Sequence, residues 1–381
     1  MKSEFSRISI SSYLKASFFF LSLVFYLVMC TTLIPLVFLY HEILTWFNFD
    51  MRKFKVHVGK LWLVITHSLI AIAVGGNAQV IYDKRIAEKK DAKSILLSNH
   101  ITYLDWIFIW SALLQLKKQN IRFVAKEGIG SIFFLGMGMR MLNFILLSRE
   151  MKKDAPKIKE ACELLNQEKQ FSLVIFPEGT FIDKGTKQKD FTFLDEQQKR
   201  RLEKDPNCPP SLPDCVSAVH KKVIFPRVKG FKLFIDELHT HLDCIINCTL
   251  YIKSLDPTKY PAEYYTPEEI CKGHRQKMPI TLILDYLPFE KGIETNSNTW
   301  LHQNFQARDK LLQDLDNLTE AQIFNYHRTH TPVNSSYETL FLRSDPYSTI
   351  FLSSGALLVL SLLLFTLYFA GTKLLSLCRP A

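Results

Sequence analysis

The segment from Ser94 to Trp106 contains the residues of this chain that are best suited to chemistry. His100 and Asp105 have four residues between them and stand where an apolar run typical of a buried strand gives way to one typical of a helix. An imidazole, with a pKa of about 6.5, can accept a proton from an alcohol at neutral pH. A carboxylate bonded to its other nitrogen fixes the tautomer and stabilises the imidazolium. The pair therefore predicts general-base catalysis.

The spacing of this pair constrains the local structure. Positions i and i+5 of a regular helix diverge by about 140°, so His100 must precede the helix that carries Asp105. The sequence predicts that helix over Thr102 to Lys117, with Thr102 as its cap and Asp105 placed as in a capping box. The same pattern also fits a structural interpretation, in which Asp105 only satisfies helix N–H groups and His100 is an ordinary loop residue.

A second polar site follows the apolar run from Phe171 to Phe176. The residues from Pro177 to Thr180 bring a carboxylate, Glu178, and backbone N–H groups to the end of a predicted strand. Because glycine permits unusual dihedrals and leaves room for substrate, the backbone at Gly179 and Thr180 is predicted to donate to the oxyanion of a tetrahedral intermediate. The alternative is a plain strand end followed by a turn. Two polar sites on two buried strands favour an enzyme.

These motifs, in this order, resemble those of the glycerolipid acyltransferase family, which includes the lysophosphatidic acid acyltransferases. Its Asn-His-x4-Asp pattern matches Asn99, His100 and Asp105, and its Phe-Pro-Glu-Gly-Thr pattern matches Phe176 to Thr180. The segments 134–149 and 226–231 are similar to the branch that acts on lysophosphatidylinositol and lysocardiolipin. The similarity covers residues 90 to 255, with a weaker echo to 320.

The resemblance implies the transfer of a fatty acyl group from acyl-CoA, as co-substrate, to the sn-2 hydroxyl of lysophosphatidylinositol or lysophosphatidic acid, by direct attack and with no bound cofactor. It implies that His100 and Asp105 are catalytic. A CoA-independent transacylase and a membrane protein that binds lipid without turnover are the alternatives. The substrate-binding residues that it implies, with Arg149 on the acceptor phosphate, are Asn99, Arg149, Glu178, Gly179, Thr180 and Arg227.

Two positions depart from the family pattern. Phe181 stands where many members have an arginine after Glu-Gly-Thr, which removes a phosphate ligand, and Phe133 stands where many have a proline. Lys184, Arg227 or Lys229 is a candidate to supply the missing charge. The departures leave His100 and Asp105 intact and leave the acceptor head group open.

The pattern of elements predicts an α/β fold, with a mixed sheet flanked by helices as in acyltransferases. Besides those already named, strands are expected at 91–100, 121–126, 139–147, 223–225 and 244–252, where the last completes the sheet, and a helix at 152–169. The predicted domains are a membrane-anchor region over 1–82, a catalytic domain over 83–254 with a charged, proline-rich insertion at 184–222, a cap with a strand and a helix over 255–345, and a transmembrane helix over 346–373.

Two uncharged runs, Ala16 to Tyr40 and Ser348 to Thr372, are long enough to cross a hydrocarbon core of about 30 Å. We interpret the first as a retained signal anchor and the shorter run Leu61 to Gly76 as an interfacial or re-entrant segment. An integral protein of the endoplasmic reticulum membrane is expected. Charge asymmetry does not fix its topology, but sequons at Asn247, Asn317 and Asn334 would report it.

The net charge of +10 has no accompanying basic and aromatic pattern for nucleic acid. Between Lys117 and Lys169, 11 Lys and Arg face 6 Asp and Glu, which suits an anionic bilayer surface or a phosphorylated substrate. The eight cysteines contain no Cys-x-x-Cys pair, so reduced thiols and no metal site are expected.

Overall fold

The computed structural model describes residues 10–47, 49–74, 78–192, 220–254, 256, 258–266, 268–269, 278–331 and 335–377. The chain forms two compact units. One contains the helices near both ends of the chain, within 1–76, 267–276 and 343–381. The other contains the sheet, within 77–266 and 277–342.

Three helices pack against one another in the first unit: α1 (Ile10–Trp46), α2 (Arg52–Val74) and α14 (Pro346–Leu377). Buried polar groups join α1 to α2, because the hydroxyls of Tyr26 and Thr66 lie 2.7 Å apart and Trp62 Nε1 donates to the Tyr26 hydroxyl at 2.9 Å.

Among the described residues, one helix is long and apolar enough to cross a membrane, which is α1 over the 33 residues Leu14–Trp46. This agrees in length and composition with the N-terminal membrane helix predicted over Ala16 to Tyr40. The stretches His57–Ile72 in α2 and Pro346–Leu362 in α14 are apolar but shorter. A C-terminal membrane helix therefore stays a prediction.

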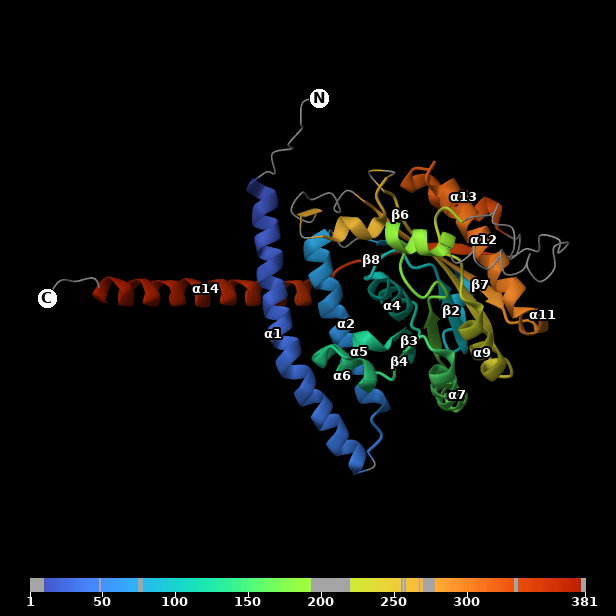
Figure 1. Cartoon of the computed structure of the whole chain (residues 1–381), viewed down its shortest axis with the longest axis horizontal. Coiled ribbons are helices and arrows are strands. Elements are labelled where there is room, and N and C mark those ends of the chain that lie inside the picture. Colours follow the sequence, from blue (N-terminus) through green and yellow to red (C-terminus); the bar gives the residue numbers. More distant parts are fainter. Residues whose placement is uncertain are drawn as a thin grey trace. The chain divides into compact units, whose positions relative to one another are not determined.

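An eight-stranded mixed sheet organises the second unit, in the order β4-β3-β5-β2-β6-β7-β1-β8 (Figure 1). The first five strands in this order are parallel, β7 is antiparallel to β6 but parallel to β1, and β8 is antiparallel to β1. This confirms the predicted α/β fold with a mixed sheet. The strands are β1 (Ala78–Asp83), β2 (Ser94–Ser98), β3 (Ile121–Lys126), β4 (Ile145–Leu147), β5 (Ser172–Ile175), β6 (Cys244–Ile252), β7 (Ile280–Pro288) and β8 (Tyr337–Leu342).

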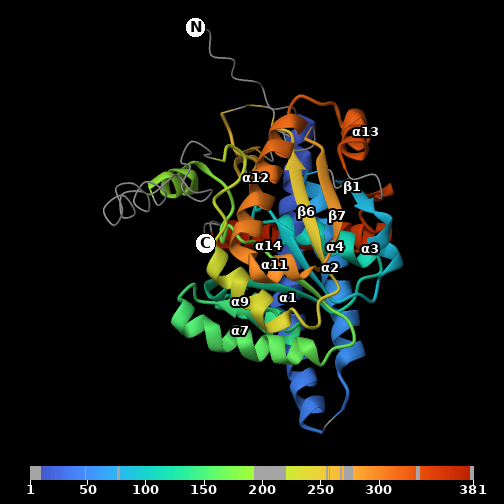
Figure 2. The ribbon, with the colours of Figure 1, turned by 90° about the vertical axis from the view of Figure 1, so that its right-hand side faces the viewer.

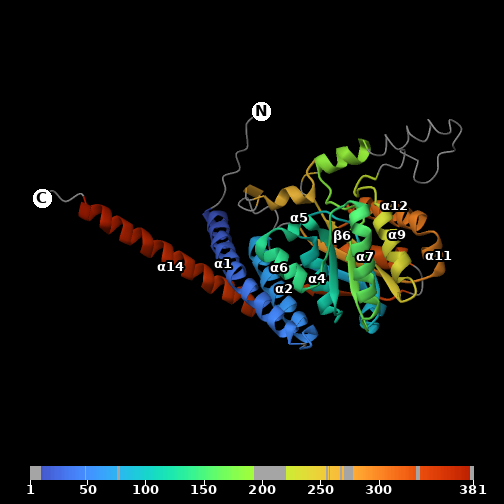
Figure 3. The ribbon, with the colours of Figure 1, turned by 60° about the horizontal axis from the view of Figure 1, so that its bottom comes forward.

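Helices cover both faces of this sheet. One face is covered by α7 (Met151–Asn166), α9 (Val228–Leu238) and α12 (Ser297–Leu315), and α7 and α9 lie side by side (Figures 2 and 3). The opposite face carries α4 (Asp105–Gln115). Because β2 is buried on both faces, its middle residues Ile95 to Leu97 form a continuous apolar run rather than an alternating pattern.

The remaining described elements are short or peripheral. They are α3 (Lys84–Glu88), α5 (Glu127–Gly130), α6 (Phe133–Met141), the 3₁₀ helix η2 (Pro261–Tyr265), α11 (Lys291–Thr295) and α13 (Glu320–His330).

Several predicted elements differ from the observed ones. The run 139–147 is the end of α6 followed by β4, and 223–225 is not a strand. Residues 184–192 of the predicted insertion are helical, while 193–219 lie outside the described residues. The strand β6 does not complete the sheet, because β7, β1 and β8 follow it. The segments assigned to an anchor region and a cap thus contribute strands to the sheet.

The topology determines where polar loops gather. The strands β2, β3, β4 and β5 are parallel, so the loops that follow them emerge at one edge of the sheet. His100, Arg149 and Glu178 all lie in such loops.

Candidate active site

His100 and Asp105 are hydrogen-bonded at the carboxyl end of β2. His100 follows that strand, Asp105 is the first residue of α4, and the atoms His100 Nδ1 and Asp105 Oδ2 lie 2.8 Å apart. The His100 side chain is 20 % exposed, whereas the Asp105 side chain is fully buried. With Nδ1 on the carboxylate, Nε2 is the nitrogen that can face a substrate.

The helix begins later than predicted, for a clear reason. The N-cap is Leu104, whose N–H donates to the Thr102 hydroxyl at 3.1 Å. The Thr102 N–H donates to Asp105, as in the predicted capping box, and its hydroxyl donates there too at 2.6 Å. The Ile101 N–H donates to Asp105 Oδ2 at 2.7 Å. The Asp105 carboxylate therefore accepts from Ile101 and Thr102 in the turn that precedes α4, and this turn brings His100 back to it.

Aromatic rings surround the imidazole of His100. Phe176 stacks on it with ring centroids 4.5 Å apart, and Phe181 meets it edge-on at 5.8 Å. Tyr103 in turn contacts Phe181. Phe181 thus contributes to the wall of the site beside His100.

Glu178 is bonded to the backbone of the loop that carries His100. Its side chain is fully buried, and its two oxygens accept from the backbone N–H groups of His100 and Ile224, each at 2.9 Å. Burial raises the pKa of Glu178 to about 8. Because both oxygens face backbone donors, Glu178 holds the His100 loop rather than presenting an oxygen to solvent.

Asn99 is also turned inward. It is fully buried, and its side-chain amide both donates to the Leu250 carbonyl and accepts from the Leu250 N–H, each at 2.8 Å. These bonds fix the end of β2 against β6. The position supports a structural role and not the substrate contact predicted from the resemblance.

Gly179 adopts a left-handed conformation with φ of 74°, which favours glycine. Its N–H donates to the Phe176 carbonyl at 2.9 Å, so this group is not available to an oxyanion as predicted. The described residues offer the Thr180 N–H no such acceptor, and Thr180 is the remaining candidate in this turn.

Two arginines meet at Gly179. Arg149, after β4, donates to the Gly179 carbonyl, and a Cβ at Gly179 would lie 3.4 Å from Arg227 Cδ and Nε. Arg227 also donates its backbone N–H to Pro177 at 2.8 Å. Burial, and then the neighbouring charge of Arg227, lowers the pKa of Arg149. Two adjacent like charges favour an anionic ligand.

A buried arginine absent from the predicted site lies behind it. Arg308 of α12 is 2 % exposed and donates to the Leu97 carbonyl at 3.2 Å and to the Asn247 side chain. Burial lowers its pKa to about 10, against the attraction of Cys248 and then Glu178. Its Nε and second terminal nitrogen have no hydrogen-bond partner among the described residues. An arginine within an amphipathic helix gives no sequence signal of this placement.

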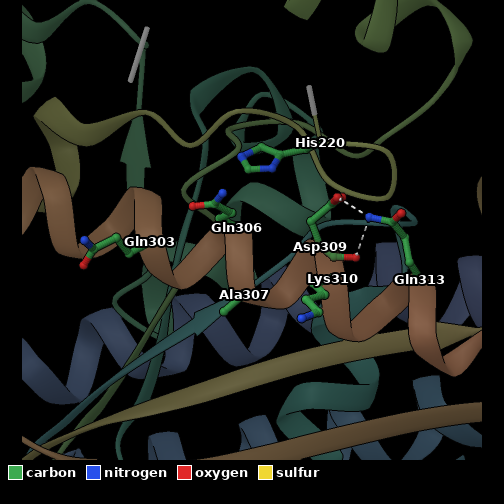
Figure 4. Close-up of a pocket in the computed structure, with 7 residues that line it drawn as sticks. All are labelled: His220, Gln303, Gln306, Ala307, Asp309, Lys310 and Gln313. Carbon is green, nitrogen blue, oxygen red and sulfur yellow. Dashed lines mark hydrogen bonds between the residues drawn. The ribbon is translucent and has the colours of Figure 1, made fainter. Parts of the chain in front are cut away.

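The next residue, Asp309, holds the segment that reaches Glu178. Its Oδ1 accepts from the N–H groups of Lys222 and Val223, at 2.6 and 3.2 Å, directly before Ile224 donates to Glu178. Asp309 also borders a surface hollow of about 450 Å³ formed by His220 and the α12 face from Gln303 to Gln313 (Figure 4). That hollow contains none of the predicted site residues.

Among the described residues, no three His, Cys, Asp or Glu side chains gather in a way that could hold a metal ion. The described cysteines Cys30, Cys162, Cys244 and Cys248 are buried and unpaired. Cys208, Cys215, Cys271 and Cys378 lie outside the described residues.

Comparison with known proteins matches part of the chain to one family model. Residues 79–199 match the family model described as Acyltransferase, a span that includes His100, Asp105, Arg149 and Glu178. The chain therefore contains an acyltransferase domain.

Over a longer span, the chain is similar to proteins named as lysophospholipid acyltransferases. It is 23 % identical over 335 residues to lysocardiolipin acyltransferase 1 of Mus musculus, covering 86 % of this chain and 80 % of that protein. It is 21 % identical over 313 residues to 2-acyl-1-lysophosphatidylinositol acyltransferase of Saccharomyces cerevisiae, covering 70 % and 74 %. An uncharacterised acyltransferase of Schizosaccharomyces pombe is 25 % identical over 234 residues, covering 58 % and 60 %. The chain spans only 60 % and 52 % of the first fungal and plant relatives that it matches.

Proposed function

We propose that this protein is an acyl-CoA-dependent lysophospholipid acyltransferase that esterifies the sn-2 hydroxyl of lysophosphatidylinositol or lysophosphatidic acid in phospholipid synthesis or remodelling. The observation that carries the proposal is the 2.8 Å contact of His100 Nδ1 with Asp105, in a loop whose backbone is bonded to Glu178. The contact leaves Nε2 of a partly exposed imidazole to act as a base.

The reaction follows from these groups. His100 Nε2 takes the hydroxyl proton of the acceptor while the hydroxyl oxygen attacks the thioester carbonyl. Asp105 stabilises the imidazolium that results. The Thr180 N–H is the proposed donor to the oxyanion of the tetrahedral intermediate. Collapse of the tetrahedral intermediate breaks the carbon–sulfur bond, and the imidazolium returns its proton to the leaving CoA thiolate.

Arg149 and Arg227 support an anionic acceptor. Their guanidinium groups both lie at Gly179, within the loop that also carries Glu178. Guanidinium groups bind phosphate oxygens with directed hydrogen bonds. A lysophospholipid whose phosphate binds here would direct its hydroxyl toward His100. Asn99 and Glu178 then act by holding the loops rather than by contacting substrate.

The acceptor is amphipathic, and α1 provides a helix suited to a membrane. We propose residence in the endoplasmic reticulum membrane, where an aqueous acyl-CoA and a bilayer lysophospholipid can both reach one site.

The test is acyl transfer by the full chain in membranes, with acyl-CoA and a panel of lysophospholipids. His100→Ala should abolish transfer, by at least about 10²-fold, because general-base catalysis is worth about that much. His241→Ala is the matched control, since His241 is exposed outside the site, and it should retain activity.

Two results would overturn the proposal. Full activity in His100→Ala excludes the assigned base, and turnover without any acyl-CoA indicates a transacylase instead. A chain that binds lysophospholipid but transfers nothing under any donor would be a lipid-binding protein.

A further inference from the structure

Exposed apolar side chains gather on the short helical hairpin formed by α5 and α6, residues 127–141. The two helices pack against each other (Figures 1 and 3). Ile129, Ile132 and Phe133, at the turn between them, are 41 %, 46 % and 62 % exposed. Three large apolar side chains presented together to solvent within five residues of chain are unfavourable unless something covers them.

The hairpin is tightly built, so this exposure does not come from loose packing. A Cβ at Gly136 would lie 1.8 Å from the Gly130 carbonyl oxygen, and a Cβ at Gly130 would lie 2.6 Å from the side chain of Leu146. The glycines thus let α6 pack directly on α5 and let α5 pack on β4. This packing holds the turn and its apolar side chains outward.

The hairpin also belongs to the edge of the sheet that carries the site. It begins directly after β3 and leads into β4, and Arg149 follows β4 at that same edge. A surface that contacts the hairpin is therefore held beside the loops that carry the site residues.

The charges around the hairpin indicate what covers it. Lys126 precedes it and Arg140 stands in its last turn, and both are exposed. Its one acidic residue, Glu127, is paired with Lys157 at 3.0 Å. An apolar tip with unneutralised cations beside it is complementary to a bilayer leaflet with anionic head groups, because the apolar part enters the acyl region while the cations stay at the surface.

We propose that the α5–α6 hairpin inserts Ile129, Ile132 and Phe133 into the bilayer leaflet that supplies the lysophospholipid, with Lys126 and Arg140 on anionic head groups. The hairpin then keeps the carboxyl edge of the sheet against that leaflet. Its link to substrate supply rests on the proposed function, but its contact with lipid does not.

Photo-crosslinking of the full chain in anionic liposomes tests this contact. Replacing Phe133 by p-benzoylphenylalanine should give a phospholipid adduct, detected as a mass increase of the peptide. The same amino acid at Leu164 or Phe341 is the matched control, since these side chains are 52 % and 50 % exposed on α7 and β8. The adduct at position 133 should be severalfold more abundant than at either control.

Equal lipid adducts at all three positions, or adducts at position 133 only to protein, would overturn the proposal. Repeating the labelling in a His100→Ala background separates it from the proposed function, because lipid contact needs no turnover. A chain that labels at 133 but transfers no acyl group would refute only the proposed function, and a chain that transfers normally without labelling would refute only the hairpin.

Discussion

Two buried carboxylates, those of Asp105 and Glu178, accept hydrogen bonds from His100. Asp105 accepts from the imidazole and from the backbone and hydroxyl of the following turn, whereas Glu178 accepts only backbone N–H groups. The first carboxylate is therefore in direct contact with the imidazole of His100, and the second contacts only the backbone of the loop that carries His100. Replacement of each is expected to have a different signature.

Asp105→Asn tests the direct contact. The amide can accept from Nδ1–H through its oxygen only if its NH2 group replaces Oδ1 and faces the Thr102 donors, so either the tautomer or the turn is lost. We expect a decrease in kcat on the order of 10²-fold or more, as for other orienting carboxylates. Thr102→Val is the control, because it removes the hydroxyl bonds to Asp105 and to the Leu104 N–H but keeps the contact of Asp105 with His100, and it should cost far less. Acyl-transfer rates at saturating acceptor measure both, and equal losses would contradict the assignment.

Arg308 is expected to affect the pH dependence of acyl transfer, because its charge lowers the pKa of Glu178. Burial raises the pKa of that carboxyl to about 8, the charge of Arg308 opposes the rise, and nearby Asp105 adds to it, while Lys187 on 184–192 is attracted to Glu178. Removing the Arg308 charge must therefore raise the Glu178 pKa further. The pH midpoint of the rise in activity should be higher in Arg308→Met than in the unchanged protein. In Arg308→Lys it should lie between the two.

The measurement is the pH profile of kcat/KM in membranes. The folded pKa of Glu178 lies above its unfolded value, so its contribution to stability is present at low pH and is lost as pH rises through about 8. The unfolding midpoint of Arg308→Met should consequently fall more on the alkaline side. A uniform loss of activity at every pH would mean that Arg308 has only a packing role.

At the scale of elements, the packing of α6 on α5 depends on one close approach. Gly136→Ala places a Cβ 1.8 Å from a backbone oxygen, which cannot be relieved by a side-chain rotation, so destabilisation of about 1–3 kcal/mol is expected. Gly230→Ala, in α9, is the control: nothing lies within 4 Å, and a helical glycine replaced by alanine should gain up to about 1 kcal/mol. Thermal unfolding in detergent compares them, and equal midpoints would contradict the packing.

Sequence predicted some elements well and others poorly, for physical reasons. The strands at 121–126 and 244–252 have the predicted bounds, because apolar runs with β-branched residues between polar segments are distinctive. The run 139–147 joins the end of a helix to a strand, and apolar composition does not separate the two. The predicted bond from the Thr102 N–H to Asp105 is present, but the N-cap is Leu104 and the helix begins at Asp105 rather than at Thr102.

The arrangement of the site residues was also predicted only in part. The short-range pattern predicted His100 beside Asp105 correctly in position, and the order of strands brings Arg149 and Arg227 to Gly179. The inward orientation of Asn99 and Glu178 could not be predicted, because their partners are 151 and 46 or more residues away. Arg308 is 211 residues from the Leu97 carbonyl that it reaches, and only the fold relates them.

On the scale of the whole molecule, burial decides which sequons can report topology. Asn247 lies within β6 and its side chain accepts from Arg308, so it should carry no glycan in the folded protein on either side of the membrane. Asn317, between α12 and α13, is exposed. Asn334 lies outside the described residues.

We therefore expect that Asn247→Gln leaves the electrophoretic mobility unchanged. A glycosidase-sensitive shift that is lost in Asn317→Gln would place the sheet unit in the lumen. Its absence, together with modification of a tag added on the far side of α1, would place the unit in the cytosol. A glycan on Asn247 in active protein would contradict the buried position of that residue.

The pairing of β1 with β8 has a structural consequence of its own. Ala78 and Leu342, the first residue of the sheet and the last, are partners in register at one margin. Main-chain hydrogen bonds thus join β1, which follows α2 in the chain, to β8, which precedes α14. The two ends of the sheet unit therefore adjoin, so the helices outside it could be exchanged for others without disturbing the order of its strands.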